Sequence, residues 1–173
     1  YLDDFNDLLD DANFIVDMAI RENLDKDIFC LGHSMGGFTI SLFGAKYPKK
    51  DIKGIITCGA LTSNNSDLTK NIEEGLDPKM QVPNELGDGV CSVKAIMDDY
   101  LSDPLNKKCI TMVLFYQLLE GIDWFSERRK DFSYPLLILH GEDDSLVSVK
   151  DSYELFHKAQ VKDRQMKIYG GLY

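Results

Sequence analysis

One serine in this sequence lies among three glycines, in the segment LGHSMGGF at residues 31–38. Residues 32–36 match the pattern G-x-S-x-G, which presents a nucleophilic serine when it connects a strand end to a helix start. In that turn the residues two before and two after the serine are forced together, so only small residues are expected at Gly32 and Gly36. Gly37 is expected to let the helix approach the sheet closely. The pattern predicts that the serine, Ser34, has a strained conformation with positive φ.

The chemistry of such a turn is nucleophilic attack by the serine hydroxyl. The hydroxyl would project at a helix N-terminus, where free N–H groups stabilise an oxyanion, and the N–H of Met35 would be one of two donors. The neighbouring His33 is expected to direct its ring away from the hydroxyl. The alternative is a glycine-rich turn that packs well or cradles phosphate, although the sequence has neither a Walker lysine nor G-x-G-x-x-G spacing here.

A serine nucleophile needs a base, and the base needs an acid that orients it. In folds with this turn the acid follows the serine along the chain and the histidine comes last. Three carboxylates, Glu142, Asp143 and Asp144, follow an apolar run that ends at residue 139. A carboxylate just past the carboxyl end of a parallel strand lies at the same edge of the sheet as the serine turn. One of the three is therefore the candidate acid, and at least one is expected to cap the next helix.

The elements that would hold these groups alternate between strands and helices. Continuous apolar runs predict buried strands, and apolar residues three and four apart predict helices with one buried face. The predicted strands cover residues 28–31, 52–58, 135–139 and 166–169, and the predicted helices cover 5–23, 39–47, 93–101 and 149–159. This alternation favours an α/β fold with a mostly parallel sheet and helices on both faces.

Roughly 75 residues separate the second predicted strand from the third, far more than a crossover requires. We expect a core over residues 1–60 with the serine turn, a helical lid or cap insertion over 61–130, and a core over 131–173 with the acidic turn. Within the insertion, residues 112–119 are strongly apolar. The insertion residues expected to face a lipid-like substrate are Phe115, Leu118, Leu119 and Trp124. The alternative is a helix pair packed on the core.

Composition argues against several classes of function. The chain has 173 residues, 44% of them hydrophobic, and a net charge of −10. Since phosphate binding needs a basic face, we expect no nucleic-acid partner, and no apolar run has the length of a membrane span. The cysteines, Cys30, Cys58, Cys91 and Cys109, lack the spacing of a zinc or redox motif, so no metal or cofactor is expected. They favour a reduced, cytoplasmic protein.

The segments GHSMGG, PLLILHGEDDSLV and SDPLN together resemble the α/β-hydrolase superfamily. The resemblance is strongest to the monoacylglycerol lipase and lysophospholipase-like serine hydrolases, and it runs through nearly the whole chain. It implies that Asp144 is the acid, with Asp143 as the alternative, and that the insertion is a lid above an acyl-chain channel. It also implies an enzyme that cleaves carboxylic esters of lipid-like substrates, such as a monoacylglycerol or a lysophospholipid, through an acyl-enzyme.

Two features of that superfamily are expected outside this sequence. The loop with the second oxyanion donor would precede Tyr1, and the catalytic histidine would be the residue after Tyr173. The three histidines present are not expected to replace it: His33 lies beside the nucleophile, His140 ends a buried strand, and His157 belongs to a helix surface. We therefore expect the chain by itself to be inactive, with the first strand forming an exposed apolar edge of half a sheet.

Two other functions stay open at this stage. An amino- or imino-peptidase of the same fold would need an acid in the lid to hold the substrate amine, and Glu120, Asp123 and Glu127 could supply it. A non-catalytic binding module could be built on the same fold. No pattern in the sequence indicates an oligomeric state.

Overall fold

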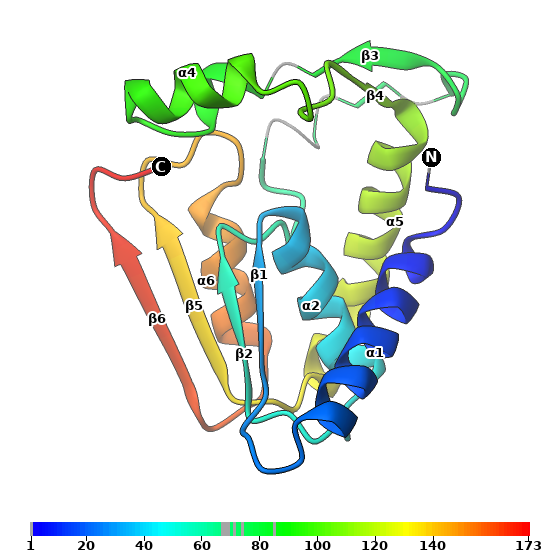
Figure 1. Ribbon diagram of the computed structural model, residues 1–173, viewed down its shortest axis with the longest axis vertical. Coiled ribbons are helices and arrows are strands. Elements are labelled where there is room, and N and C mark those ends of the chain that lie inside the picture. The colour runs from blue at the N-terminus through cyan, green and yellow to red at the C-terminus, as the bar shows by residue number, and fades with distance from the viewer. Residues whose placement is uncertain (1, 67–69, 71, 74, 85) are drawn as a thin grey trace.

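The computed structural model describes residues 2–66, 70, 72–73, 75–84 and 86–173. Its centre is a parallel sheet of four strands in the order β1-β2-β5-β6 (Figure 1). The strands are β1 (Phe29–His33), β2 (Gly54–Cys58), β5 (Leu136–Gly141) and β6 (Arg164–Tyr169). All the predicted strands are present, and they all run in the same direction.

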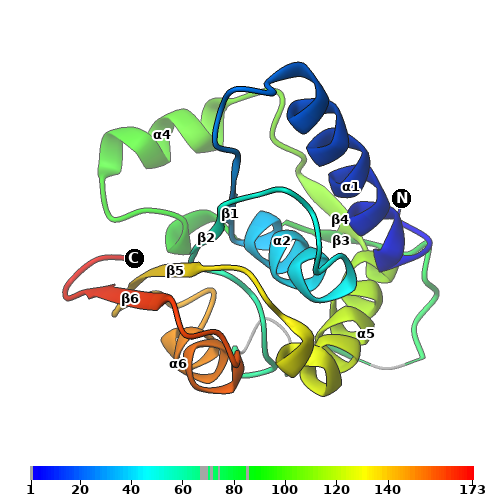
Figure 2. The same cartoon turned by 90° about the horizontal axis from the view of Figure 1, so that it is seen from below.

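Four helices lie on one face of this sheet (Figure 2). They are α1 (Phe5–Glu22), α2 (Met35–Lys46), α5 (Met112–Arg128) and α6 (Val149–Lys158). Helix α2 contacts β1 and β2, α6 contacts β5 and β6, and both α1 and α5 contact α2. The prediction of helices on both faces is therefore not met within the described residues. A continuous apolar run indicates that a strand is buried, but it does not tell which element covers each face.

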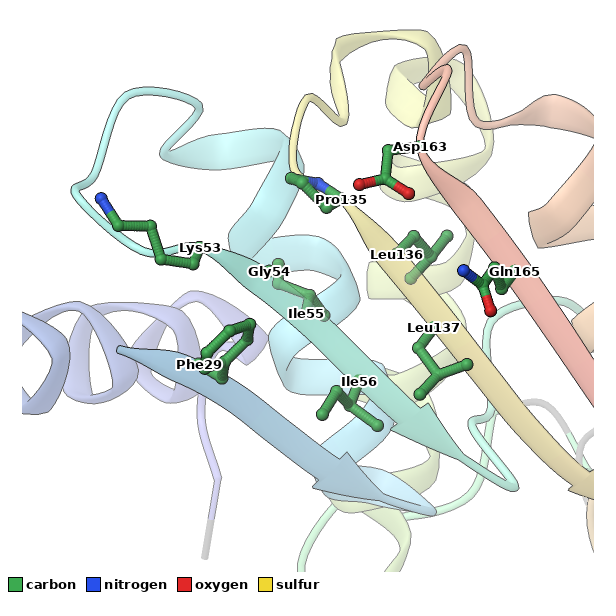
Figure 3. Close-up of a pocket in the computed structure, with 10 residues that line it drawn as sticks. All are labelled: Phe29, Lys53, Gly54, Ile55, Ile56, Pro135, Leu136, Leu137, Asp163 and Gln165. Carbon is green, nitrogen blue, oxygen red and sulfur yellow. The ribbon is translucent and has the colours of Figure 1, made fainter. Parts of the chain in front are cut away.

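The two faces of the sheet differ in burial. Ile55 and Ile138 point toward the helices and are almost fully buried, whereas Phe29 and Leu31 on the opposite face are 58% and 67% exposed. Figure 3 shows this second face, where Phe29 and Ile56 line a shallow cavity of about 240 Å³. Among the described residues β1 is an end strand of the sheet. The predicted exposed apolar edge is therefore confirmed.

Helix α5 belongs to the hydrophobic core, as the alternative interpretation of the insertion predicted. Leu118, Ile122 and Phe125 are buried in the same cluster as residues of α1 and α2. Gly121 permits the close approach of α5 to α2, because a Cβ at this position would lie 2.4 Å from Cζ of Phe38. The segment 61–130 predicted as a lid thus includes one helix of the core.

Another part of the insertion lies above the carboxyl edge of the sheet and the start of α5 (Figure 1). It contains an antiparallel ribbon of β3 (Gln81–Pro83) and β4 (Cys109–Thr111), the short 3-10 helix η1 (Gly87–Gly89), and helix α4 (Lys94–Ser102). The sequence does not predict the ribbon, because three residues are too few to show alternation and a proline argues against a strand. We call residues 86–101, which include η1 and most of α4, the cap.

The buried side chain of Arg129 joins the two ends of the insertion. Its Nη2 donates to the carbonyl oxygen of Thr62 and to Oγ of Ser63, each at 2.6 Å. Its Nη1 donates to Oε2 of Glu154 on α6 at 3.1 Å. The buried carboxylate of Asp151, also on α6, accepts the N–H groups of Thr62 at 3.1 Å and Ser63 at 2.9 Å. Arg129 is paired with Glu154, and the Asp151 carboxylate is hydrogen-bonded to backbone N–H groups, so together they hold both ends of the insertion against α6.

Candidate active site

The turn from β1 into α2 holds Ser34 in a strained conformation. With φ of 52° and ψ of −117°, Ser34 is the one residue other than glycine with positive φ in the described part of the chain. Its N–H donates to the carbonyl of Cys58 at the end of β2 at 2.9 Å, and its carbonyl accepts from the N–H of Phe38 at 3.0 Å. These bonds hold a conformation that costs on the order of 1–3 kcal/mol. The positive φ predicted from the sequence pattern is confirmed.

The three glycines around Ser34 differ in what they permit. A Cβ on Gly32 would lie 2.2 Å from the carbonyl oxygen of Gly36, because the backbone folds back on itself there. A Cβ on Gly37 would lie 2.5 Å from Cβ of Ala60, so Gly37 lets α2 approach the end of β2 as predicted. A Cβ on Gly36 would meet no atom within 4 Å. The prediction that Gly36 must be small is therefore wrong, since only its backbone takes part in the close contact.

We expect Gly32→Ala and Gly36→Ala to change stability in opposite directions. A methyl group at position 32 forces the backbone apart, at a cost of about 3 kcal/mol, which lowers Tm by about 6–12 °C. A methyl group at position 36 has space and should stabilise α2 by up to about 1 kcal/mol, because alanine loses less backbone entropy in a helix. Thermal unfolding followed by circular dichroism measures both effects. Equal destabilisation by the two variants would contradict this account.

Helix α2 begins at Met35, directly after the serine. The N–H groups of a first helical turn have no partner inside their own helix, and the helix dipole adds partial positive charge at that end. The N–H of Met35 therefore adjoins the Ser34 hydroxyl as a candidate donor to an oxyanion.

Three groups hold the carboxylate of Asp144 in the turn after β5. Its Oδ1 accepts the N–H groups of Leu146 at 3.0 Å and Val147 at 2.8 Å. Its Oδ2 lies 3.3 Å from Nε2 of His140. Burial by itself raises the pKa of this carboxyl, but the hydrogen bonds from His140, Val147 and Leu146 outweigh burial and lower the pKa below its ordinary value. The carboxylate is therefore ionised near neutral pH and fixed in orientation.

The other two carboxylates of this turn, Glu142 and Asp143, have exposed side chains. Their backbone N–H groups donate to carbonyl oxygens near the end of the chain, those of Tyr169 at 2.9 Å and Leu172 at 3.1 Å respectively. The N-cap of α6 is Ser148. The prediction that one of the three acids caps the next helix is therefore wrong, because the turn extends four residues beyond Asp144 before the helix begins.

Ser34 and Asp144 line one cavity of about 630 Å³ at the carboxyl edge of the sheet. The ends of β1, β2 and β5 contribute one side of it, and the cap contributes the opposite side. The apolar or aromatic lining residues that come from the cap and the acid turn are Leu86, Val90, Tyr100, Leu146 and Val147. A Cβ on Gly89 would lie 2.8 Å from the side chain of Leu146, so the cap packs directly on the acid turn.

No pattern in the sequence predicts that the cap residues Leu86, Val90 and Tyr100 line this cavity. Two of them flank η1, a segment too short for a periodic pattern, and Tyr100 lies on one face of α4 with other apolar residues. The available signal was the pair Gly87 and Gly89, since closely spaced glycines permit a backbone to approach another element.

None of the four predicted lid residues lines the cavity beside Ser34. Leu118 is 6% exposed within the core, and Leu119 and Trp124 lie on the same core helix. Phe115 lines a second cavity of about 340 Å³, which shares two wall residues with the first. The wall of the cavity beside Ser34 therefore comes from the cap and the acid turn, not from α5. The helical spacing that suggested a channel marks the side of α5 that faces the core.

The three histidines lie in different environments. Both ring nitrogens of the buried His140 are hydrogen-bonded, Nδ1 to Oγ of Ser152 at 2.6 Å and Nε2 to the backbone of the acid turn at 2.9 Å. Nδ1 of His33 lies 3.1 Å from the carbonyl oxygen of Cys58. His157 is exposed on α6. His140 therefore hydrogen-bonds the acid turn that follows its strand.

Within the described ranges, no group of three or more His, Cys, Asp or Glu side chains is arranged to hold a metal ion. No helix in that same part of the chain is long and apolar enough to cross a membrane. The four cysteines are free thiols.

A parallel sheet that leads into a strained serine turn, with a carboxylate after a later strand, defines the α/β-hydrolase class. Solved structures confirm this fold. The crystal structure of the monoacylglycerol lipase of Paleococcus ferrophilus matches with a TM-score of 0.80 at 24% identity, over 95% of this chain and 66% of that one. A soluble variant of the monoglyceride lipase of Saccharomyces cerevisiae, in complex with a substrate analogue, matches with a TM-score of 0.80 at 22% identity, over 97% and 60%.

The chain belongs to the serine aminopeptidase S33 family (Hydrolase_4), whose sequence profile matches residues 1–173. Human monoglyceride lipase is 31% identical over 178 residues, which cover 98% of this chain and 58% of that protein. The monoacylglycerol lipase of Mycolicibacterium smegmatis is 25% identical over 179 residues, covering 100% and 64%. The chain thus spans about three fifths of the length of these relatives. The resemblance to monoacylglycerol lipases inferred from three short segments is confirmed.

Proposed function

We propose that the protein is a serine hydrolase that cleaves carboxylic esters of lipid-like substrates through an acyl-enzyme. The observation that carries the proposal is the shared cavity, which brings together a strained serine turn and a fixed carboxylate. Ser34 attacks the ester carbonyl, and the N–H of Met35 stabilises the oxyanion. Asp144 orients the base, which takes the serine proton and gives it to the departing alcohol as the ester C–O bond breaks, and which later activates the water that releases the acyl group.

The base in this proposal is a histidine of the full-length protein outside residues 1–173. Both ring nitrogens of His140 are engaged with Ser152 and the acid turn, which leaves neither for a serine proton. Leu172 and Tyr173 line the same cavity as Ser34. A base directly after Tyr173, which the superfamily resemblance implies, would therefore lie close to this cavity.

The lining of the cavity favours an apolar acyl group over a substrate amine. Asp144 is the one carboxylate among its described lining residues, and the cap contributes mainly apolar side chains. The acids that a peptidase could have used, Glu120, Asp123 and Glu127, are exposed on α5 and do not line the cavity. The names of the lipase relatives agree with an ester substrate.

Hydrolysis of p-nitrophenyl esters of increasing chain length by the full-length protein tests the proposal. We expect turnover of the esters, with a preference for chains longer than acetate, and no turnover of aminoacyl p-nitroanilides. Hydrolysis of the anilides without the esters would favour the peptidase. Failure to hydrolyse either series would favour the non-catalytic binding module.

We expect Val90→Trp to shift the ester preference toward shorter chains. Val90 lines the cavity beside Ser34, so the larger side chain reduces the space for the acyl group. Leu118→Trp is the matched control, because it adds similar bulk inside the core and should cost about 1–3 kcal/mol of stability without changing the preference. Profiles of kcat/KM against chain length, with Tm for each variant, separate the two effects. A chain-length profile that shifts only in Leu118→Trp would indicate instead that α5 forms the wall that contacts the acyl group.

A further inference from the structure

We propose that His140 is a positioning residue, a buried imidazole that holds the Asp144 carboxylate with Oδ2 available to the catalytic base. The hydrogen-bond geometry is independent of any activity, whereas its catalytic consequence rests on the proposed function. The argument begins with the two oxygens of the carboxylate, because they differ in how many donors they already accept.

Oδ1 of Asp144 accepts two backbone N–H groups, from Leu146 at 3.0 Å and from Val147 at 2.8 Å. Since a carboxylate oxygen has two lone-pair sites, Oδ1 has no capacity left. Oδ2 has the long contact of 3.3 Å to Nε2 of His140. A Cβ at Gly59 would lie 3.3 Å from Oδ2, so the absence of a side chain at Gly59 leaves space beside this oxygen. Oδ2 is therefore the oxygen that can accept a further N–H from the base.

The surroundings of His140 determine which ring nitrogen carries the proton. Nε2 faces two acceptors, the carbonyl oxygen of Val147 at 2.9 Å and Oδ2 of Asp144 at 3.3 Å, so Nε2 must be the donor. Nδ1 lies 2.6 Å from Oγ of Ser152, whose hydroxyl can donate to it. A ring that donates from Nε2 and accepts at Nδ1 thus satisfies every contact. His140 and Ser152 are 1% and 2% exposed, so water does not compete for these bonds.

In the described part of the chain, His140 also supplies the one side-chain hydrogen bond to the acid. Among the described residues, Asp144 forms no ion pair with lysine or arginine. The other titratable side chains that line the same cavity include His33 and Cys58, and the thiol pKa of Cys58 is raised first by burial and then by the charge of Asp144. The Nε2–H group therefore does two things. It stabilises the ionised carboxylate, and it keeps the carboxylate from rotating about its Oδ1 bonds while Oδ2 stays beside the cavity.

Variants of His140 and Ser152 in the full-length protein test this positioning role. His140→Leu removes the donor, whereas His140→Gln keeps an amide N–H near the place of Nε2. Ser152→Ala removes only the partner of Nδ1, and it serves as the second variant where His140→Leu lowers the melting temperature severely. The Asp144 carboxyl is titrated by ¹³C NMR in each protein, and kcat and KM are measured on one p-nitrophenyl ester.

We expect the pKa of Asp144 to rise toward its ordinary value in His140→Leu, to rise less in Ser152→Ala, and to stay low in His140→Gln. We expect kcat to fall by about 10–100-fold in His140→Leu, with little change in KM and with recovery in His140→Gln, since the effect is one of orientation. An unchanged Asp144 titration in both His140→Leu and Ser152→Ala, or an unchanged kcat in folded His140→Leu, overturns the proposal. If the wild-type protein hydrolyses no ester, the proposed function fails. The titration of Asp144 by itself then tests whether His140 donates a hydrogen bond to this carboxylate.

Discussion

Replacing Ser34 with alanine should abolish ester hydrolysis by the full-length protein while leaving the fold intact. The hydroxyl is the one atom of this turn that can form the acyl-enzyme, and loss of the nucleophile in comparable triads lowers kcat by about 10⁶-fold because the triad acts as a unit. Alanine has the same backbone preferences as serine at the positive φ of position 34, so Tm should change little. The measurement is kcat on a p-nitrophenyl ester together with thermal unfolding.

The assignment of the nucleophile has an independent test in covalent labelling. A fluorophosphonate probe should label the wild-type protein at Ser34, and the Ser34→Ala variant should not react. Ser145→Ala is a matched control, because Ser145 is an exposed serine in the acid turn next to Asp144. Labelling that persists in Ser34→Ala and disappears in Ser145→Ala would indicate that Ser145, in the acid turn, is the nucleophile.

Asp144→Asn should lower kcat by roughly 10⁴-fold, as loss of the orienting carboxylate does in serine protease triads. The amide oxygen of asparagine can still accept the N–H groups of Leu146 and Val147, so the turn should keep its shape. The amide NH₂ group would instead face Nε2 of His140, which costs about 1 kcal/mol as one lost hydrogen bond. The expected result is a large kinetic defect with a small loss of stability.

Asp143→Asn is the control that fixes the register of the acid turn. It removes the same charge one residue earlier, from a side chain that is exposed. We expect kcat within a few-fold of the wild-type value and an unchanged Tm. A larger kinetic defect in Asp143→Asn than in Asp144→Asn would transfer the role of the acid to Asp143.

The sequence predicts the strands and the serine turn because their signals are local. Strand β5 is a continuous apolar run in which alternate residues, such as Leu136 and Ile138, are almost fully buried. The positive φ of Ser34 is predictable because the G-x-S-x-G pattern is contained in five neighbouring residues, although the bond from its N–H to Cys58 on β2 also holds this conformation. Local patterns of this kind predict a strand or a turn independently of the surface on which it packs.

The sequence does not predict which surface covers the cavity, because that choice depends on contacts between distant segments. Leu118 on α5 and Val90 in the cap are both apolar, yet one contacts the core and the other lines the cavity. An amphipathic pattern shows that a helix has a buried face but does not name its partner. Gly121 was the missed signal for α5, since its close contact with Phe38 places the helix against α2.

The bond from Arg129 to Thr62 has a consequence for how this chain can vary. It closes the segment between these residues into a loop whose ends are fixed. The entropy of closing a loop increases only with the logarithm of its length, and each doubling costs about 0.6 kcal/mol. Residues can thus be added to or removed from the cap at low thermodynamic cost, provided that η1 still packs on the acid turn. Ser34 and Asp144 lie outside the loop, so the cap wall of the cavity and the geometry of these two residues can change independently during evolution.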